Sequence, residues 1–184
     1  MSANPRRELL RLHTERELHI ARVTLSAFVV EQAEKARGEV GFGWVPQPDA
    51  PSRYGALLDA FNRSSETGEP LPVSDEHSGS VIYADAEVNY ALRFLHDVSH
   101  VQKRLTFELT DELELALWHL STLEAEGFGP QTVVWQLLRA DLMGSVYVIA
   151  LARRFPEDQK RFAEGCLYDG FDASVLAELR RSKR

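Results

Sequence analysis

The sequence predicts an all-α fold: a single-domain helical bundle with a long N-terminal helix and a Pro/Gly-rich loop. Apolar residues recur at steps of three and four over most of the chain, which is the period of amphipathic helices. No segment keeps up the alternation of apolar and polar residues that marks a half-buried strand. The 184 residues, 44% of them hydrophobic and 27% charged, suit one folded core and exclude a disordered chain.

Residues 1–37 are predicted to form one long amphipathic helix. Charged residues separate six apolar residues that follow one another mostly at helical steps: Leu9, Leu12, Ile20, Val23, Ala27 and Val30. Such spacing places the apolar side chains along one side of the helix and the charged residues between them, which makes the helix amphipathic. Gly38 is the expected end of the helix, because glycine weakens a helix interior.

Residues 38–80 are predicted to be a Pro/Gly-rich loop segment. Proline supplies no backbone donor and glycine weakens helices, and both are dense in this part of the chain. One short helix is expected at 54–61, where Leu57, Leu58 and Phe61 could dock on the core. Connections of this length inside a compact domain are commonly functional or mobile.

Residues 81–184 are predicted to be the helical core. A first helix is expected to begin near Asp85, and a second near Thr110, where acids follow a capping residue. After a Gly/Pro break, 131–154 is expected to form a central helix that is apolar nearly all round. A proline followed by acids predicts a restart after 155, and a last short helix is expected at 172–181.

Charge and cysteine content narrow the partners and the compartment. The formal net charge of −7 argues against nucleic-acid binding, because that binding depends on neutralising phosphates. The single Cys166 excludes an intrachain disulfide and suits a reducing compartment. The N-terminal region lacks the pattern of a signal or transit peptide, and the most apolar stretch is interrupted by Arg139 and Asp141. We therefore expect a cytoplasmic protein, with peripheral contact to a membrane left open.

Four residues form a candidate metal site: His96, Asp97, His100 and Glu112. Two histidines four residues apart project from one face of a helix, so both rings can reach one ion. On a straight helix Glu112 would lie about 18 Å from His100, so its participation requires a turn within 105–110. Asp97 could be a third ligand, an orienting carboxylate or a proton acceptor. Imidazoles with carboxylates suit zinc or iron(II), with manganese also compatible.

The pattern His-Asp-x-x-His, followed after eleven residues by Glu, resembles the signature of the ubiquinone (coenzyme Q) biosynthesis protein four family, which is all-helical and holds a divalent metal. The resemblance covers roughly residues 85–154 and suggests a divergent member. It implies removal or replacement of a carboxyl group at ring position C1 of a polyprenylated quinone precursor, by lyase or oxidoreductase chemistry, or support of the enzymes that do this. Family members often carry a glycine just after the second histidine, whereas 101–105 contains none.

The resemblance also implies an apolar cavity and apolar partners. The expected lining comprises Phe94, Leu95, Leu117, Trp118 and the helix segment 142–149, although each residue alone could be ordinary core. The expected partners are an isoprenoid or other apolar small molecule and biosynthetic proteins, and a homo-oligomer is compatible with the sequence.

Two other functions fit parts of the pattern. The Leu95-His96-Asp97 unit is similar to HD-type metal-dependent phosphohydrolases, for which His77 and Asp141 would be the further ligands. Alternatively, the chain could be a non-enzymatic helical module that binds lipid or protein, with the polar cluster serving stability only.

Overall fold

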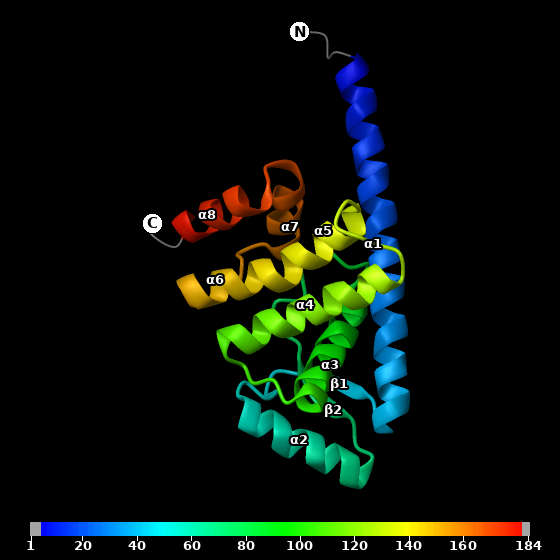
Figure 1. Ribbon diagram of the computed structural model, residues 1–184, viewed down its shortest axis with the longest axis vertical. Helices are drawn as coiled ribbons and strands as arrows, with labels where there is room; N and C mark the ends of the chain where they lie inside the picture. The colour runs from blue at the N-terminus through cyan, green and yellow to red at the C-terminus, as the bar shows by residue number, and fades with distance from the viewer. Residues whose placement is uncertain (1–4, 182–184) are drawn as a thin grey trace.

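A computed structural model describes the backbone of residues 5–181 and the side chains of residues 14–181. The elements in chain order are α1 (Pro5–Val40), β1 (Trp44–Gln47), α2 (Tyr54–Thr67), β2 (Leu71–Ser74), α3 (Ala86–Lys103), α4 (Leu109–Ala125), α5 (Val133–Arg139), the π-helix η1 (Ala140–Gly144), α6 (Ser145–Ala152), α7 (Gln159–Tyr168) and α8 (Phe171–Arg181). Helices dominate, so the predicted all-α class is confirmed. Helix α1 runs along one edge of the molecule, and its N-terminal part extends beyond the other helices (Figure 1).

The predicted long N-terminal helix is present, but the apolar stripe seen in the sequence is not the side that packs on the bundle. The side that packs against α3 and α5 carries Leu25, Phe28 and Val29, all buried. The expected stripe instead points outward where its side chains are described: Ile20 is 52% exposed, Val23 50% and Val30 41%, and Ala27 is also exposed. Leu9 and Leu12 lie outside the residues whose side chains are described. We call Ile20, Val23, Ala27 and Val30 the outer stripe. The helix continues past Gly38 to Val40, and Gly41 follows with φ +82°.

The segment predicted as loop contains a small parallel sheet. Strand β1 pairs with β2 from Trp44 opposite Leu71 to Gln47 opposite Ser74, and α2 makes the crossover between the strands. Leu71 and Val73 alternate inward, but a strand of four residues is too short to give a visible period-two pattern. The ring of Trp44 stacks on Phe94 of α3 with centroids 4.9 Å apart. The sheet thereby covers the face of α3 near the predicted metal motif.

The predicted helix start at Asp85 is confirmed, whereas Thr110 does not cap the next helix, because α4 begins at Leu109 and its N-cap residue Glu108 makes no side-chain capping bond. The side chain of Asp85 accepts a hydrogen bond from the backbone N–H of Val88 and caps α3. Asp158 caps α7 in the same way, through the N–H of Arg161. Asp158 also accepts from the hydroxyl of Ser80 at 2.7 Å, which ties the start of α7 to the segment before α3.

The central helix is one rod made of α5, η1 and α6, and it lies beside α4 (Figure 1). By length and composition, Val133–Ala152 is the one helix within the described residues that could cross a bilayer. It also packs in the interior against α1, α4 and α7, and it carries Arg139 and Asp141. The apolar core helix of a folded domain meets the same criteria, so this is weak evidence for a membrane span.

Candidate metal centre

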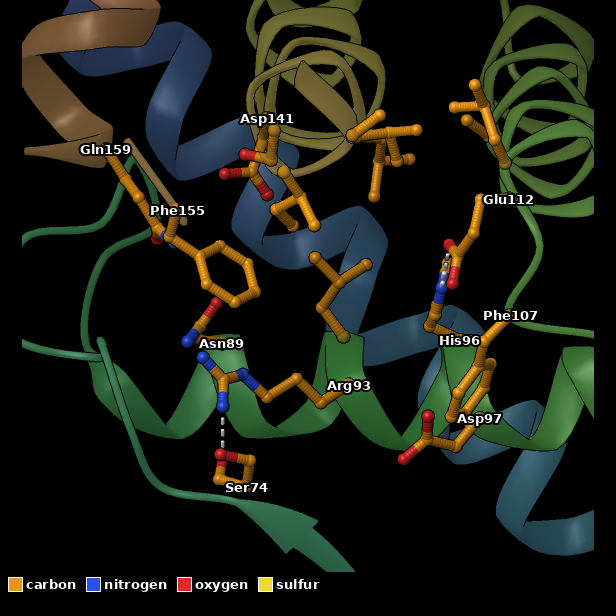
Figure 2. A pocket seen from close by; sticks show the side chains of 18 of the residues that line it. Ser74, Asn89, Arg93, His96, Asp97, Phe107, Glu112, Asp141, Phe155 and Gln159 are labelled. Carbon is orange, nitrogen blue, oxygen red and sulfur yellow. Dashed lines mark hydrogen bonds and ion pairs between the residues drawn. The ribbon is translucent and has the colours of Figure 1, made fainter. Parts of the chain in front are cut away.

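Three of the four predicted ligands converge where α3 meets α4. His96 and His100 place their Nε2 atoms 2.9 Å apart. Glu112, in the first turn of α4, places Oε2 3.2 Å from Nε2 of His96 and Oε1 3.5 Å from Nε2 of His100. All three ligand atoms lie within 4.8 Å of one another, so one ion could bind them together. Figure 2 shows Glu112 reaching down from α4 toward His96 on α3.

The bend between the two helices, which the ligand set required, is present. Helix α3 ends at Arg104, whose φ of +58° is left-handed. The backbone N–H of Leu105 then donates to the carbonyl of His100 at 3.0 Å. The carboxylate of Asp111 accepts from both the N–H and the hydroxyl of Thr106, at 2.7 and 2.6 Å. A non-glycine residue in this conformation costs about 1–2 kcal/mol, which the surrounding hydrogen bonds must offset.

The tautomer of His100 is set by the same turn. Its ring is fully buried, and Nδ1 lies 3.0 Å from the carbonyl oxygen of Leu105. Because a carbonyl only accepts, Nδ1 carries the proton, and in the neutral ring Nε2 presents a lone pair toward His96 and Glu112. Backbone carbonyls commonly orient metal-binding histidines in this way. Among the side chains described, none bonds to the buried Nδ1 of His96.

Glu112 is held in its ionised form. Burial by itself would raise the pKa of this carboxyl, but its contacts with the rings of His100 and His96, which stabilise the ionised carboxylate when the facing ring nitrogen is protonated, outweigh the burial and place the pKa at about 2. A carboxylate that stays ionised through neutral pH is a competent ligand for a divalent cation.

Asp97 is not part of the three-residue cluster, although it lines the adjacent cavity. Burial raises the pKa of Asp97 to about 7, against the opposing influence of His100 and Arg93, while Glu112 adds to the rise. Of the four predicted ligands, three are therefore close enough to share an ion, and Asp97 is not. Of the roles considered for Asp97, those beside the ligand cluster, orientation or proton transfer, fit this placement better than direct ligation.

His119 adjoins the cluster, although from the sequence a lone histidine in this helix could either approach the site or be an ordinary interior residue. Its ring is buried and lies against that of His96 with centroids 5.5 Å apart. Burial lowers the pKa of His119 well below its ordinary value, and His96, His100 and Lys103 lower it further. It is therefore neutral at neutral pH, and within the described structure its Nε2 has no partner. The spacing of seven residues from Glu112, which puts both on one face of α4, was the available signal.

A cavity of about 600 Å³ opens beside the cluster, within the range of sites for small organic molecules. Its middle wall is apolar, with Leu92 from α3, Ala116 from α4 and, from the central rod, Leu142, Val146 and Ile149. The predicted lining by segment 142–149 thus holds in part. Phe94 and Leu95 are buried core residues instead, and Leu117 and Trp118 face outward, so these four expected lining residues are absent from the wall.

The further ligands that an HD-type phosphohydrolase would need do not join the cluster. His77 lies in the chain segment between β2 and α3, and its ring centroid is 5.2 Å from that of Phe155. Asp141 accepts a hydrogen bond from the hydroxyl of Tyr83 at 2.6 Å. Neither belongs to the group of described residues whose ligand atoms are close enough to share an ion.

Comparison with protein families, with curated proteins and with solved structures finds no match to this chain. Its function has to be inferred from the site itself and from the sequence motif.

Proposed function

We propose that this protein is a metal-dependent enzyme that acts on a largely apolar, oxygen-bearing precursor. The precursor class is the polyprenylated quinone ring that the motif's resemblance implies. The observation that carries the proposal is the convergence of His96, His100 and Glu112 at one end of an apolar cavity. A ligand cluster inside a cavity can present an ion to a small molecule, whereas a purely structural site is closed by its ligands.

The donor set favours zinc or iron(II), because it combines two imidazoles with one carboxylate and leaves further coordination positions for water or substrate. When bound, the ion would supply a Lewis acid, and iron would add redox chemistry. The chain's own residues would position the ion and partly neutralise its charge. The carbonyl of Leu105 fixes the ring of His100, and Glu112 contributes a negative charge. Loss of a ring carboxyl releases carbon dioxide and needs one proton at the ring carbon. Asp97 lines the cavity and is a candidate to hold that proton.

Metal content tests the proposal most directly. We expect purified protein to retain close to one equivalent of zinc or iron by elemental analysis. We expect Glu112→Gln, which keeps the side-chain shape, to weaken binding at least as much as the about 10- to 100-fold typical of outer-shell changes. Glu108→Gln is the matched control, since Glu108 lines the same cavity without joining the cluster. Equal metal retention by all three proteins would refute the proposed centre.

Turnover separates an enzyme from a binding module. We expect the metal-loaded protein to convert a prenylated hydroxybenzoic acid to a product lighter by the mass of carbon dioxide or, when dioxygen is consumed, to a hydroxylated product. Mass spectrometry of organic extracts would detect a retained isoprenoid. An isoprenoid bound without turnover would favour the non-enzymatic module, and phosphate release from nucleotides would favour the phosphohydrolase.

A further inference from the structure

A second polar group lies in the cavity, away from the metal centre. It comprises Asn89 of α3, Asp141 of η1 and Gln159 of α7, and we call it the distal polar group. We propose that the cavity binds an elongated ligand whose neutral hydroxyl or carboxamide end is held by this group while an oxygen at the other end meets the metal centre. The first end is independent of the metal, and the second end rests on the proposed function.

The spacing along α3 sets the two ends apart. Asn89 and His96 are seven residues apart, so they share a helix face and lie about 10 Å apart along its axis. Figure 2 shows His96 and Glu112 at one end of the cavity and Asn89, Asp141 and Gln159 toward the other. Leu92 lies between the two polar ends on the same face. The ligand therefore needs an apolar body about 10 Å long.

The distal polar group has unused hydrogen-bonding capacity. Gln159 is only 9% exposed, yet its amide makes no hydrogen bond to any side chain or backbone group that the structure describes. The buried carboxyl of Asp141 uses Oδ2 to accept from Tyr83, which leaves Oδ1 for another donor. The amide atoms of Gln159 keep some exposure to the cavity, so a ligand can pair with them without displacing an existing hydrogen bond within the protein. Both groups can pair with a hydroxyl, which donates and accepts.

The charges of this region favour a neutral ligand end. Arg93 also lines the cavity, and its positive charge acts on Asp141. Its guanidinium is already engaged by the backbone carbonyls of Ser74 and Glu76. Near the distal polar group the charges of Arg93 and Asp141 oppose each other, and the guanidinium of Arg93 has no free pair of N–H groups for an anion. The other arginine of the cavity lining, Arg153, is exposed at the C-terminal end of α6, twelve residues along the rod from Asp141. A phosphate or carboxylate end would therefore lack the usual charge-assisted partners.

The π-helix accounts for the position of Asp141. A π turn adds a residue to a helical turn and is common at functional sites. Within Ala140–Gly144 it lets Asp141 and Leu142 both reach the cavity wall from the central rod. An apolar rod thus presents a single carboxyl beside an otherwise aliphatic surface.

Paired hydroxamic acids test the inference, because the hydroxamate head binds zinc and the tail can be varied. Zinc-loaded protein is titrated calorimetrically with hexyl, octyl and decyl compounds that end in either a methyl or a hydroxyl group. At the best length we expect the hydroxyl end to improve affinity about 5- to 10-fold, the effect of one hydrogen bond. Gln159→Leu should remove that preference and leave the methyl compound unweakened. Gln102→Leu, an exchange outside the cavity, is the matched control and should change nothing.

The two ends of the ligand are read out separately. Zinc dependence of the methyl-ended compounds tests the metal centre, and the hydroxyl-to-methyl ratio tests the distal polar group in both zinc-loaded and metal-free protein. Asp141→Asn, which keeps the side-chain shape, gives a second variant and should also lower the ratio. No hydroxyl preference at any length, or a preference that survives both variants, would overturn the inference whether or not zinc binds. Absence of binding by every compound would overturn both proposals.

The outer stripe of α1 carries a second, independent inference. We propose that two copies of this chain associate through their α1 helices in antiparallel orientation. Ile20, Val23, Ala27 and Val30 follow steps of three and four, the spacing of a paired-helix seam, and point away from the face that packs on the bundle. Because α1 forms an edge of the molecule, a second helix can approach this side (Figure 1).

Charge complementarity selects the second copy and its direction. In an antiparallel pair centred between Val23 and Ala27, Ile20 lies opposite Val30 of the other copy. The exposed Arg16 then lies opposite Glu34 of the other copy. A parallel pair would instead place each Arg16 opposite Arg16, which is unfavourable. A seam of about three turns is short, so we expect association that depends on protein concentration.

Sedimentation analysis over a concentration series tests this association. We expect a monomer–dimer equilibrium whose dissociation constant rises at least about tenfold in Val23→Glu. Leu176→Glu is the matched control, since Leu176 is 52% exposed on α8, and it should not change the constant. Glu34→Arg should weaken the dimer, and adding Arg16→Glu should restore it. A monomer at all concentrations, or a dimer indifferent to Val23→Glu, would overturn the proposal, and restoration failing in the double variant would overturn the antiparallel arrangement.

Discussion

Replacing Asp97 with asparagine should stabilise the metal-free protein at neutral pH. Burial raises the pKa of this carboxyl from its ordinary value of 3.8 to about 7. Its ionised form is therefore disfavoured in the folded state. A shift of about 3 pKa units corresponds to about 4 kcal/mol. The side chain is only partly buried and touches an open cavity, so we expect about half of this, about 2 kcal/mol.

The sign follows from proton linkage. The unfolded chain releases this proton near pH 4 and the folded chain near pH 7, so the folded state binds more protons between these values. The stability of the wild type should fall across this window as pH rises, whereas Asp97→Asn should lack this loss. The difference between the two proteins should grow from near zero at pH 4 to its full size by pH 8.

Thermal and urea unfolding with a chelator present would measure the effect. We expect the melting temperature of Asp97→Asn to exceed that of the wild type by about 4–8 °C at pH 8 and to match it near pH 4. Asp111→Asn serves as an opposite-sign control, because hydrogen bonds from Thr106 lower the pKa of Asp111 and its loss should destabilise. A variant less stable than the wild type at pH 8, or one with an unchanged pH slope, would refute the reasoning about Asp97.

Three further predictions concern stability. The free energy of unfolding should fall by up to about 3 kcal/mol as pH falls from 4.5 toward 2, because the pKa of Glu112 is lowered to about 2. Urea unfolding of Glu112→Gln should lack this pH dependence. Gly144→Ala should cost about 1–2 kcal/mol, because the new Cβ would lie 2.6 Å from the buried ring of Phe162, whereas Gly38→Ala meets nothing within 4 Å and should stabilise by about 0.5–1 kcal/mol; equal melting temperatures would contradict this. Glu178→Ala should cost about 1–3 kcal/mol, because this buried carboxylate pairs with two arginines, and limited proteolysis should then release α8 first.

The parts of the fold that local chemistry determines were predictable. Asp85 begins a helix because its carboxylate accepts from a free backbone N–H group, an effect confined to a few residues. The sequence also predicted that Glu112 can approach the histidines only if the chain turns before residue 110, because a straight helix would hold it too far away to share an ion. The conformation that makes the turn was not, because Arg104 is left-handed where glycine would be expected.

The parts that depend on distant contacts were not predictable. Helix α1 has apolar residues on two sides, and only the approach of α3 and α5 decides that Leu25 and Phe28 are buried and Val23 exposed. Small residues such as Ala33 belong to the buried side but contribute little to a hydrophobic pattern. The pairing of β1 with β2 likewise joins segments separated by a helix, so no pattern within either segment predicts it.

The three ligands lie within seventeen residues of the chain, from His96 to Glu112. Closing so short a loop costs little entropy, so an ion can engage the α3–α4 hairpin before the central rod and the last two helices dock. During synthesis these ligands leave the ribosome ahead of the whole C-terminal third. If the proposed centre binds an ion, its loading can therefore precede completion of the cavity.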